Sequence, residues 1–142
     1  MDLIADTSFL VGLWRRQAWA LTFAREYPAK VLGFPWVVRG EFWHGAMRAG
    51  HDSREVEQFL ALGLPLDESR PYVLAYARVA ATLQEKDRVA YQQIGQNDLW
   101  IAAVAVETQL PLLSRNRRHF DKIEGLTLEV LQIGREDLRD EG

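Results

Sequence analysis

Short apolar runs alternate along this chain with longer segments in which apolar residues recur at helical spacing. The runs at 2–5, 30–34, 64–66, 111–114 and 126–133 have the length and composition of short buried strands. Longer segments between them predict helices at 8–27 with an interruption near 15–17, and at 36–49, 54–62, 69–91, 98–109 and 117–121. Strands separated by helices in this order predict an α/β fold, with a parallel sheet covered by helices on both faces.

Composition bounds the protein class. The chain has 142 residues, of which 48% are hydrophobic and 26% charged, a balance typical of one globular domain. We expect this domain to span 1–134, followed by a charged tail at 135–142. No apolar run approaches the roughly 18 residues that span a bilayer, so we expect a cytoplasmic protein with no membrane partner.

The residue types available restrict the chemistry. The absence of cysteine excludes disulfides, thiolate metal sites and a cysteine nucleophile. Three histidines offer little for zinc, so any metal is expected to be a hard cation held by oxygen. The net charge of −3 gives no overall sign of a nucleic-acid binder.

One aspartate stands at the first predicted strand end. Asp6 follows the apolar residues 2–5, and ligands of parallel sheets bind at the carboxyl ends of strands. An aspartate before a helix is also a common N-cap, a role that Thr7 or Ser8 would fill equally well. Structural and chemical interpretations of Asp6 both stay open on this residue alone.

Two further acids border apolar elements. Glu41 follows Val37 and Val38 by one helical turn, which indicates a position beside the core, although a surface glutamate fits the same pattern. Asp98 opens a helix that is apolar nearly all round, where the alternative is a cap shared with Asn97. Three carboxylates gathered without a counter-ion repel one another, and Mg²⁺ or Mn²⁺ removes this conflict. Such an ion also activates water for phosphodiester hydrolysis.

The ordered segments IADTSFLVGL, VVRGEFWHGA, GQNDLWIAAVAVE and LPLLSRNRRHFDKIEGL resemble the PIN-domain family, and within it the VapC-like toxin ribonucleases. The resemblance covers nearly the whole chain. It implies a three-layer α/β/α sandwich and Mg²⁺- or Mn²⁺-dependent endonucleolytic cleavage of RNA. It also implies a homodimer and, for the toxin branch of the family, a cognate antitoxin protein.

The resemblance assigns site residues by position. Asp6, Glu41 and Asp98 would be the metal-binding catalytic acids, and Asn116 would take a fourth catalytic place where many relatives have aspartate. Asparagine brings no charge, so one metal fits better than two, and Asp121 lies five residues too late to be a convincing substitute.

Hydroxyl and basic residues complete the expected site. Thr7 and Ser114 fall where the family often places hydroxyls that support the acids, although both fit ordinary capping or strand-end roles. Arg115, Arg117 and Arg118 follow a strand end beside the expected metal. They are candidates to bind RNA phosphates, the alternative being a solvated loop. His44 and His119 are interpreted as packed side chains.

Four of the five tryptophans lie between residues 14 and 43. Packing in the core is their ordinary explanation, and an apolar surface for a second subunit or an antitoxin helix is the alternative.

The leading hypothesis is therefore a metal-dependent endoribonuclease. The alternative is a PIN-like module that binds RNA or protein without cleaving it, because the Asn116 position is uncharged. A phosphotransfer domain is disfavoured, since the first strand end lacks a second aspartate two positions on, and no lysine follows residues 111–114 at the place where a receiver domain needs one.

Overall fold

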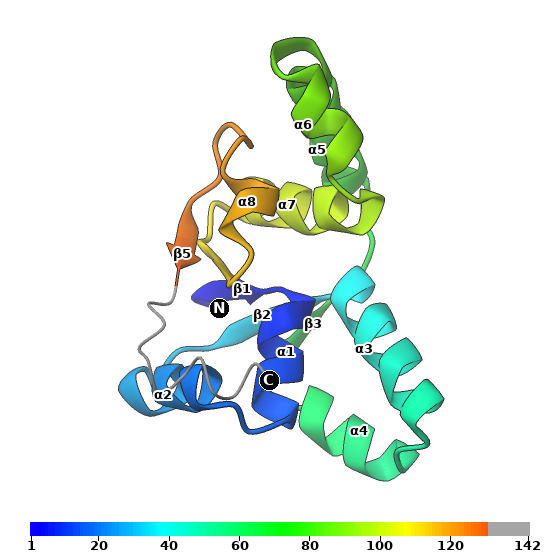
Figure 1. Ribbon diagram of the computed structural model, residues 1–142, viewed down its shortest axis with the longest axis vertical. Helices are drawn as coiled ribbons and strands as arrows, with labels where there is room; N and C mark the ends of the chain where they lie inside the picture. Colours follow the sequence, from blue (N-terminus) through cyan, green and yellow to red (C-terminus); the bar gives the residue numbers. More distant parts are fainter. Residues whose placement is uncertain (131–142) are drawn as a thin grey trace.

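The computed structural model describes residues 1–130, which form a five-stranded parallel sheet with helices on both sides (Figure 1). The strands are β1 (Leu3–Ala5), β2 (Leu32–Pro35), β3 (Leu64–Leu66), β4 (Leu112–Ser114) and β5 (Leu128–Val130). The helices are α1 (Thr7–Trp14), α2 (Ala18–Glu26), α3 (Trp36–Ala49), α4 (Ser53–Leu60), α5 (Arg70–Lys86), α6 (Arg88–Gln93), α7 (Gln96–Thr108) and α8 (Arg117–Phe120). The rest of the predicted last strand, the domain end at 134 and the tail at 135–142 lie outside the described residues.

The strand order is β3-β2-β1-β4-β5, and every neighbouring pair is parallel. The chain first builds outward from β1 through β2 to β3, then crosses to the other side of β1 for β4 and β5. Strand order therefore reverses at β1, and open α/β sheets bind ligands in the crevice beyond the carboxyl end of such a strand. Asp6 is the residue that follows β1.

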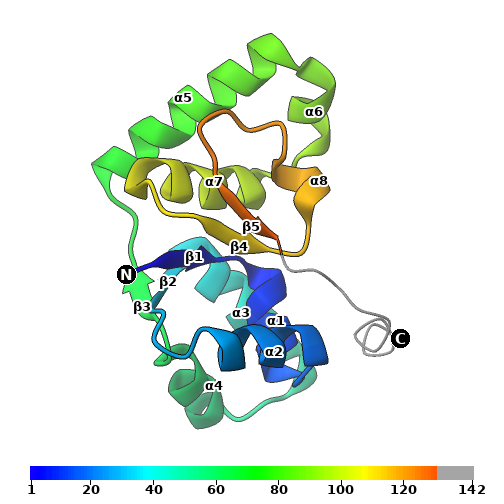
Figure 2. The same cartoon turned by 90° about the vertical axis from the view of Figure 1, so that its left-hand side faces the viewer.

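The helices form two layers around this sheet. α5, α6, α7 and α8 lie on one side, whereas α1, α2 and α4 lie on the other (Figure 2). α3 packs against both α1 and α7. It thereby brings its own residues beside the first turns of helices from both layers. The predicted three-layer α/β/α sandwich is confirmed.

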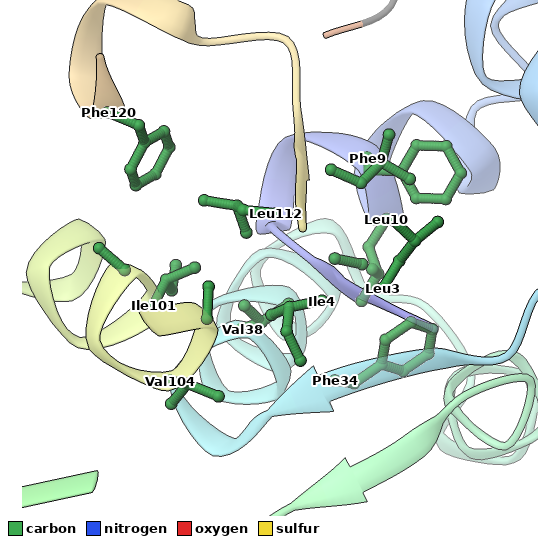
Figure 3. Packing of buried hydrophobic residues seen from close by; sticks show 14 of the residues in the cluster. Leu3, Ile4, Phe9, Leu10, Phe34, Val38, Ile101, Val104, Leu112 and Phe120 are labelled. Atoms are coloured by element: carbon green, nitrogen blue, oxygen red, sulfur yellow. The ribbon is translucent and has the colours of Figure 1, made fainter. Parts of the chain in front are cut away.

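The core fills both faces of the sheet. Phe9 and Leu10 of α1 gather with Phe34 of β2, and Phe120 of α8 is turned toward α7 near Ile101 (Figure 3). Trp19 is also buried, in edge-to-face contact with Phe9. The tryptophans at 14, 36 and 43 are half-buried and pack against this core, as the ordinary interpretation predicts.

Local signals explain where most helices begin and end. Gly50 adopts a left-handed conformation (φ 76°) and ends α3 at the predicted residue. The predicted interruption of 8–27 is confirmed by the turn between α1 and α2. The prediction of a single helix at 69–91 is wrong, because the backbone of Asp87 leaves the helical conformation and separates α5 from α6. The Asp87 side chain accepts a hydrogen bond from Ala90 N at 3.0 Å and so caps α6.

α7 begins at Gln96, two residues before the predicted start of the helix at 98. Its N-cap is Gly95, so Asp98 lies within the first turn and is not the cap. Within residues 1–130, no helix has the length and apolar character that crossing a membrane requires.

Candidate active site

Asp6 lies buried at the carboxyl end of β1. Only 3% of its surface is exposed, and within the described residues Asp6 and Ser114 are the only buried polar side chains. Asp6 Oδ1 accepts hydrogen bonds from Phe9 N at 3.0 Å and from Ser8 Oγ at 2.7 Å, so Asp6 does cap α1. Capping does not require burial, because N-caps are satisfied equally well at the surface. The role of Asp6 as an N-cap therefore does not explain why its carboxylate is buried.

Burial raises the pKa of the Asp6 carboxyl above its ordinary value. Hydrogen bonds from Ser114, Ser8 and the Phe9 amide act in the opposite direction, and the negative charge of Asp98 raises the pKa further. Asp6, which follows β1, and Asp98 of α7 are thus near enough to repel each other.

Glu41 reaches the same region from α3. Its side chain is half-buried, and Glu41 Oε1 accepts a hydrogen bond from Thr7 Oγ1 at 2.7 Å. Thr7 is the first residue of α1 and follows Asp6 directly. The predicted proximity of the Thr7 hydroxyl to an acid is therefore present, and this bond fixes Glu41 beside the end of β1.

Asp98 enters from the first turn of α7. His119 Nδ1 of α8 lies 2.8 Å from Asp98 Oδ2, so an N–H at Nδ1 donates to the carboxylate. Burial raises the pKa of the Asp98 carboxyl, His119 lowers it through charge and hydrogen bonding, and the charge of Glu41 raises it. Electrostatic coupling consequently links Asp6 to Asp98 and Asp98 to Glu41.

Asp6, Glu41 and Asp98 lie near one another but are not arranged as a complete set of metal ligands. In the part of the chain that the structure describes, no three His, Asp or Glu side chains are arranged to hold one ion. Thr7 and His119 each engage one oxygen of a carboxylate, Glu41 Oε1 and Asp98 Oδ2. The second oxygen of each has no hydrogen-bond partner within residues 1–130. The donor set suits a hard divalent cation, and side-chain rotation would be needed to bring these oxygens to one ion.

Ser114 and Asn116 lie at the end of β4 with different surroundings. The Ser114 hydroxyl is fully buried and hydrogen-bonded to Asp6, and it accepts a hydrogen bond from Asn116 N at 2.9 Å. The Asn116 side chain is exposed and does not cap α8. Ser114 thus supports the buried acid directly, whereas Asn116 borders the site from the solvent side.

The three arginines of the basic segment occupy different places. The guanidinium of Arg115 lies over the ring of Trp19, 4.4 Å from its centre. Arg117 and Arg118 are exposed on α8, and each lines a different hollow from the one that Arg115 lines. The segment is therefore not one continuous basic surface, and of the three arginines only Arg115 lines the hollow that Thr7 and Asn116 also line.

A family model for the PIN domain matches residues 3–126. The chain belongs to the PIN domain family. The match covers every element from β1 through α8, and it includes Asp6, Glu41 and Asp98.

Among curated proteins, this PIN domain is similar to the ribonuclease VapC2 of Haemophilus influenzae. The two are 24% identical over 132 residues, covering 91% of this chain and 97% of the relative. Among solved structures it resembles VapBC-1 from nontypeable Haemophilus influenzae, with a TM-score of 0.74 and 25% identity, covering 92% of this chain and 98% of that one. DNA-bound VapBC from Salmonella typhimurium gives a TM-score of 0.78 at 19% identity, covering 92% and 98% respectively.

Two histidine interpretations were wrong. His44 is exposed, and His119 is exposed yet bound to Asp98. The spacing of 21 residues between Asp98 and His119 gives no periodic signal, because the contact depends on how α8 of this PIN domain folds back onto α7. Arg15 lines one hollow together with Thr7 and Asn116, and another together with Glu41.

Proposed function

We propose that this chain is an endoribonuclease that hydrolyses RNA phosphodiester bonds with the help of Mg²⁺ or Mn²⁺. The observation that carries the proposal is the buried Asp6 carboxylate at the strand where sheet order reverses, with Asp98 and Glu41 near it. Burying like charges together is costly without a counter-ion. The similarity to VapC ribonucleases supports the same chemistry.

Each acid has a distinct role in this proposal. Asp6, Asp98 and Glu41 would hold the metal ion, which when bound polarises the phosphoryl oxygen and acidifies a water. Thr7 and Ser114 hold Glu41 and Asp6 in place through the hydrogen bonds described above. Asn116 would orient water or substrate by hydrogen bonding without adding charge. Arg115 would bind RNA backbone, while RNA contacts of Arg117 and Arg118 stay a prediction.

We further infer that the chain is the toxin of a toxin–antitoxin pair. The support is its resemblance to the toxin ribonucleases and to VapBC complexes. An antitoxin protein is then the expected partner. The predicted homodimer and cytoplasmic location stay predictions.

The alternative is a PIN domain that binds RNA or a protein without cutting. Two observations favour this binding function. Asn116 is uncharged, and Glu41 and Asp98 are bound to different side chains, Thr7 and His119, so the acids do not share one ion in this arrangement. Cleavage of a mixed RNA pool in Mn²⁺ separates the two functions.

The test compares Asp98→Asn with Glu107→Gln in the same helix. Both changes remove one negative charge with little change of shape, and Glu107 lies near the far end of α7, paired with Arg78. We expect Mn²⁺-dependent cleavage by the wild type and by Glu107→Gln, and none by Asp98→Asn. Asp6→Asn and Glu41→Gln should behave like Asp98→Asn. Wild-type protein that binds RNA without cutting it would favour the binding module.

A further inference from the structure

A hollow of about 520 Å³ is lined by residues of α6 and α8, which are neighbours in both ribbon views (Figure 1 and Figure 2). Its volume lies within the range of roughly 300–1,000 Å³ that small-molecule pockets occupy. The hollow is therefore large enough for one planar ring system with an attached sugar.

Two connections tie this hollow to the proposed reaction centre. His119 of α8 lines the hollow, and its Nδ1 lies 2.8 Å from Asp98 Oδ2. Gln93 and Ile94, at the end of α6, line the hollow as well. Gly95 follows them as the N-cap of α7, and the first turn of α7 carries Asp98. A group bound in the hollow would thus lie one side chain away from a proposed metal-binding acid.

Much of the lining is apolar. Leu83 of α5 and Ile123 after α8 are buried, and Ala90 and Ile94 are half-buried. Val89 is 62% exposed and extends the apolar lining to the surface of α6. A lining of this kind favours a flat uncharged group over a bare phosphate, because burying a charge against apolar side chains is costly.

Polar side chains of both signs line the same hollow. Arg118 and Lys122 bring positive charge. Asp87 and Asp121 bring negative charge, and the Gln93 amide both donates and accepts hydrogen bonds. A neutral ring with donors and acceptors along its edge fits this mixture better than a single anion does.

His119 offers a flat surface to such a ring. Its contact with Asp98 fixes the orientation of the imidazole, so the ring is ordered before a ligand binds. Proteins that read single-stranded RNA stack unpaired bases on aromatic and imidazole rings and bind the base edges through hydrogen bonds. Apolar packing, an ordered imidazole and an amide are therefore present together in one hollow.

We propose that the hollow between α6 and α8 binds one unpaired base of the RNA strand, beside the phosphate that is cut. This inference rests on the proposed ribonuclease function and adds a pocket that selects the base next to the cut. The base packs on Ile94 and stacks against His119, and its edge forms a hydrogen bond with the Gln93 amide. Arg118 binds the adjoining phosphate.

The first test reads the base preference of cleavage. The full chain is incubated in Mn²⁺ with single-stranded RNA of randomised sequence, and the cut ends are sequenced. We expect the wild type to prefer particular bases at one position next to the cut. Gln93→Ala should reduce this preference about fivefold, the effect of losing one hydrogen bond to the base. Gln92→Ala is the matched control and should keep the preference, because Gln92 is exposed in α6 and does not line the hollow.

The second test measures binding without cleavage. All chains carry Asp6→Asn, and the affinity for a short RNA strand is compared with that for strands that each lack one base. We expect loss of the base at one position to weaken binding about tenfold, the effect of losing one stacked base. Val89→Asp places a carboxylate beside the hollow and should abolish this difference. Val73→Asp makes the same change on an exposed valine of α5 that does not line the hollow, and should preserve the difference.

The results that would overturn the pocket are defined in the same terms. An unchanged base preference in Gln93→Ala, together with an unchanged affinity difference in Val89→Asp, would overturn it. A wild type that shows neither a base preference nor an affinity difference would also overturn it, and would favour a protein side chain as the occupant of the hollow. Gln93, Gln92, Val89 and Val73 are all exposed, so we expect each variant to fold.

Failure of the underlying function has a different signature. Suppose that the chain binds intact RNA more tightly than RNA lacking one base, that Val89→Asp loses this difference, and that the wild type never cuts RNA in Mn²⁺. That result contradicts the ribonuclease proposal and supports the pocket. Normal RNA cleavage, with both hollow variants behaving as the wild type does, contradicts the pocket alone.

Discussion

Replacing Asp6 separates its structural role from its chemical one. Asparagine caps helices about as well as aspartate and still offers an oxygen to Phe9 N and Ser8. Alanine removes the cap and leaves the buried Phe9 N–H without its acceptor, at a cost of about 1–2 kcal/mol. We therefore expect Asp6→Ala to lose about 1–2 kcal/mol, and Asp6→Asn to be at least as stable as the wild type.

Thermal unfolding followed by circular dichroism in EDTA measures this difference. A loss of about 1–2 kcal/mol lowers the Tm of a domain of this size by on the order of 5 °C. Both variants should lose RNA cleavage, because both lose the carboxylate. An Asp6→Asn variant as unstable as Asp6→Ala would show that the negative charge itself stabilises the fold, and would refute the interpretation of Asp6 as a destabilising, functional acid.

The pH dependence of the same pair has a definite sign. Burial raises the Asp6 pKa above 3.8, so the folded state binds a proton more tightly than the unfolded state. The stabilisation by this proton is fully present below pH 3.8 and is lost as pH rises through the raised pKa. Any advantage of Asp6→Asn over the wild type should therefore be largest near neutral pH and shrink toward pH 4. An advantage that grows on acidification contradicts this linkage.

Further predictions concern packing and metal affinity. Gly12→Ala should destabilise the fold by about 1–3 kcal/mol in urea unfolding, because its new Cβ would stand 2.4 Å from the Trp19 ring. Gly40→Ala has open space and should stabilise α3 by up to about 1 kcal/mol; equal effects of the two changes would contradict the packing described. His119→Ala should weaken Mn²⁺ binding about tenfold in calorimetry by releasing Asp98, with partial recovery in His119→Gln, and unchanged affinity would contradict a positioning role.

Much of the fold follows from signals local in sequence. Gly50 ends α3 where predicted, and the short apolar runs form the strands of the sheet. The break at Asp87 escaped prediction because apolar spacing continues across it, while an aspartate inside a helix is only mildly unfavourable. The backbone turn there depends on how α6 packs, which no local pattern records.

The candidate site was predictable in its strand-end residues and less so in its contacts. Asp6 and Asp98 could be identified because each stands beside a recognisable apolar element. The links from His119 to Asp98 and from Arg115 to Trp19 join distant segments, and neither spacing has a characteristic period.

The central claim is that Asp6, Glu41 and Asp98 share one hard cation. An anomalous-difference map from crystals soaked in Mn²⁺ tests it most directly. We predict one peak, with oxygen atoms of Asp6 and Asp98 at about 2.0–2.2 Å and Glu41 bound directly or through water. A map with no peak among these residues, in which Glu41 stays on Thr7 and Asp98 stays on His119 at saturating Mn²⁺, would contradict the account.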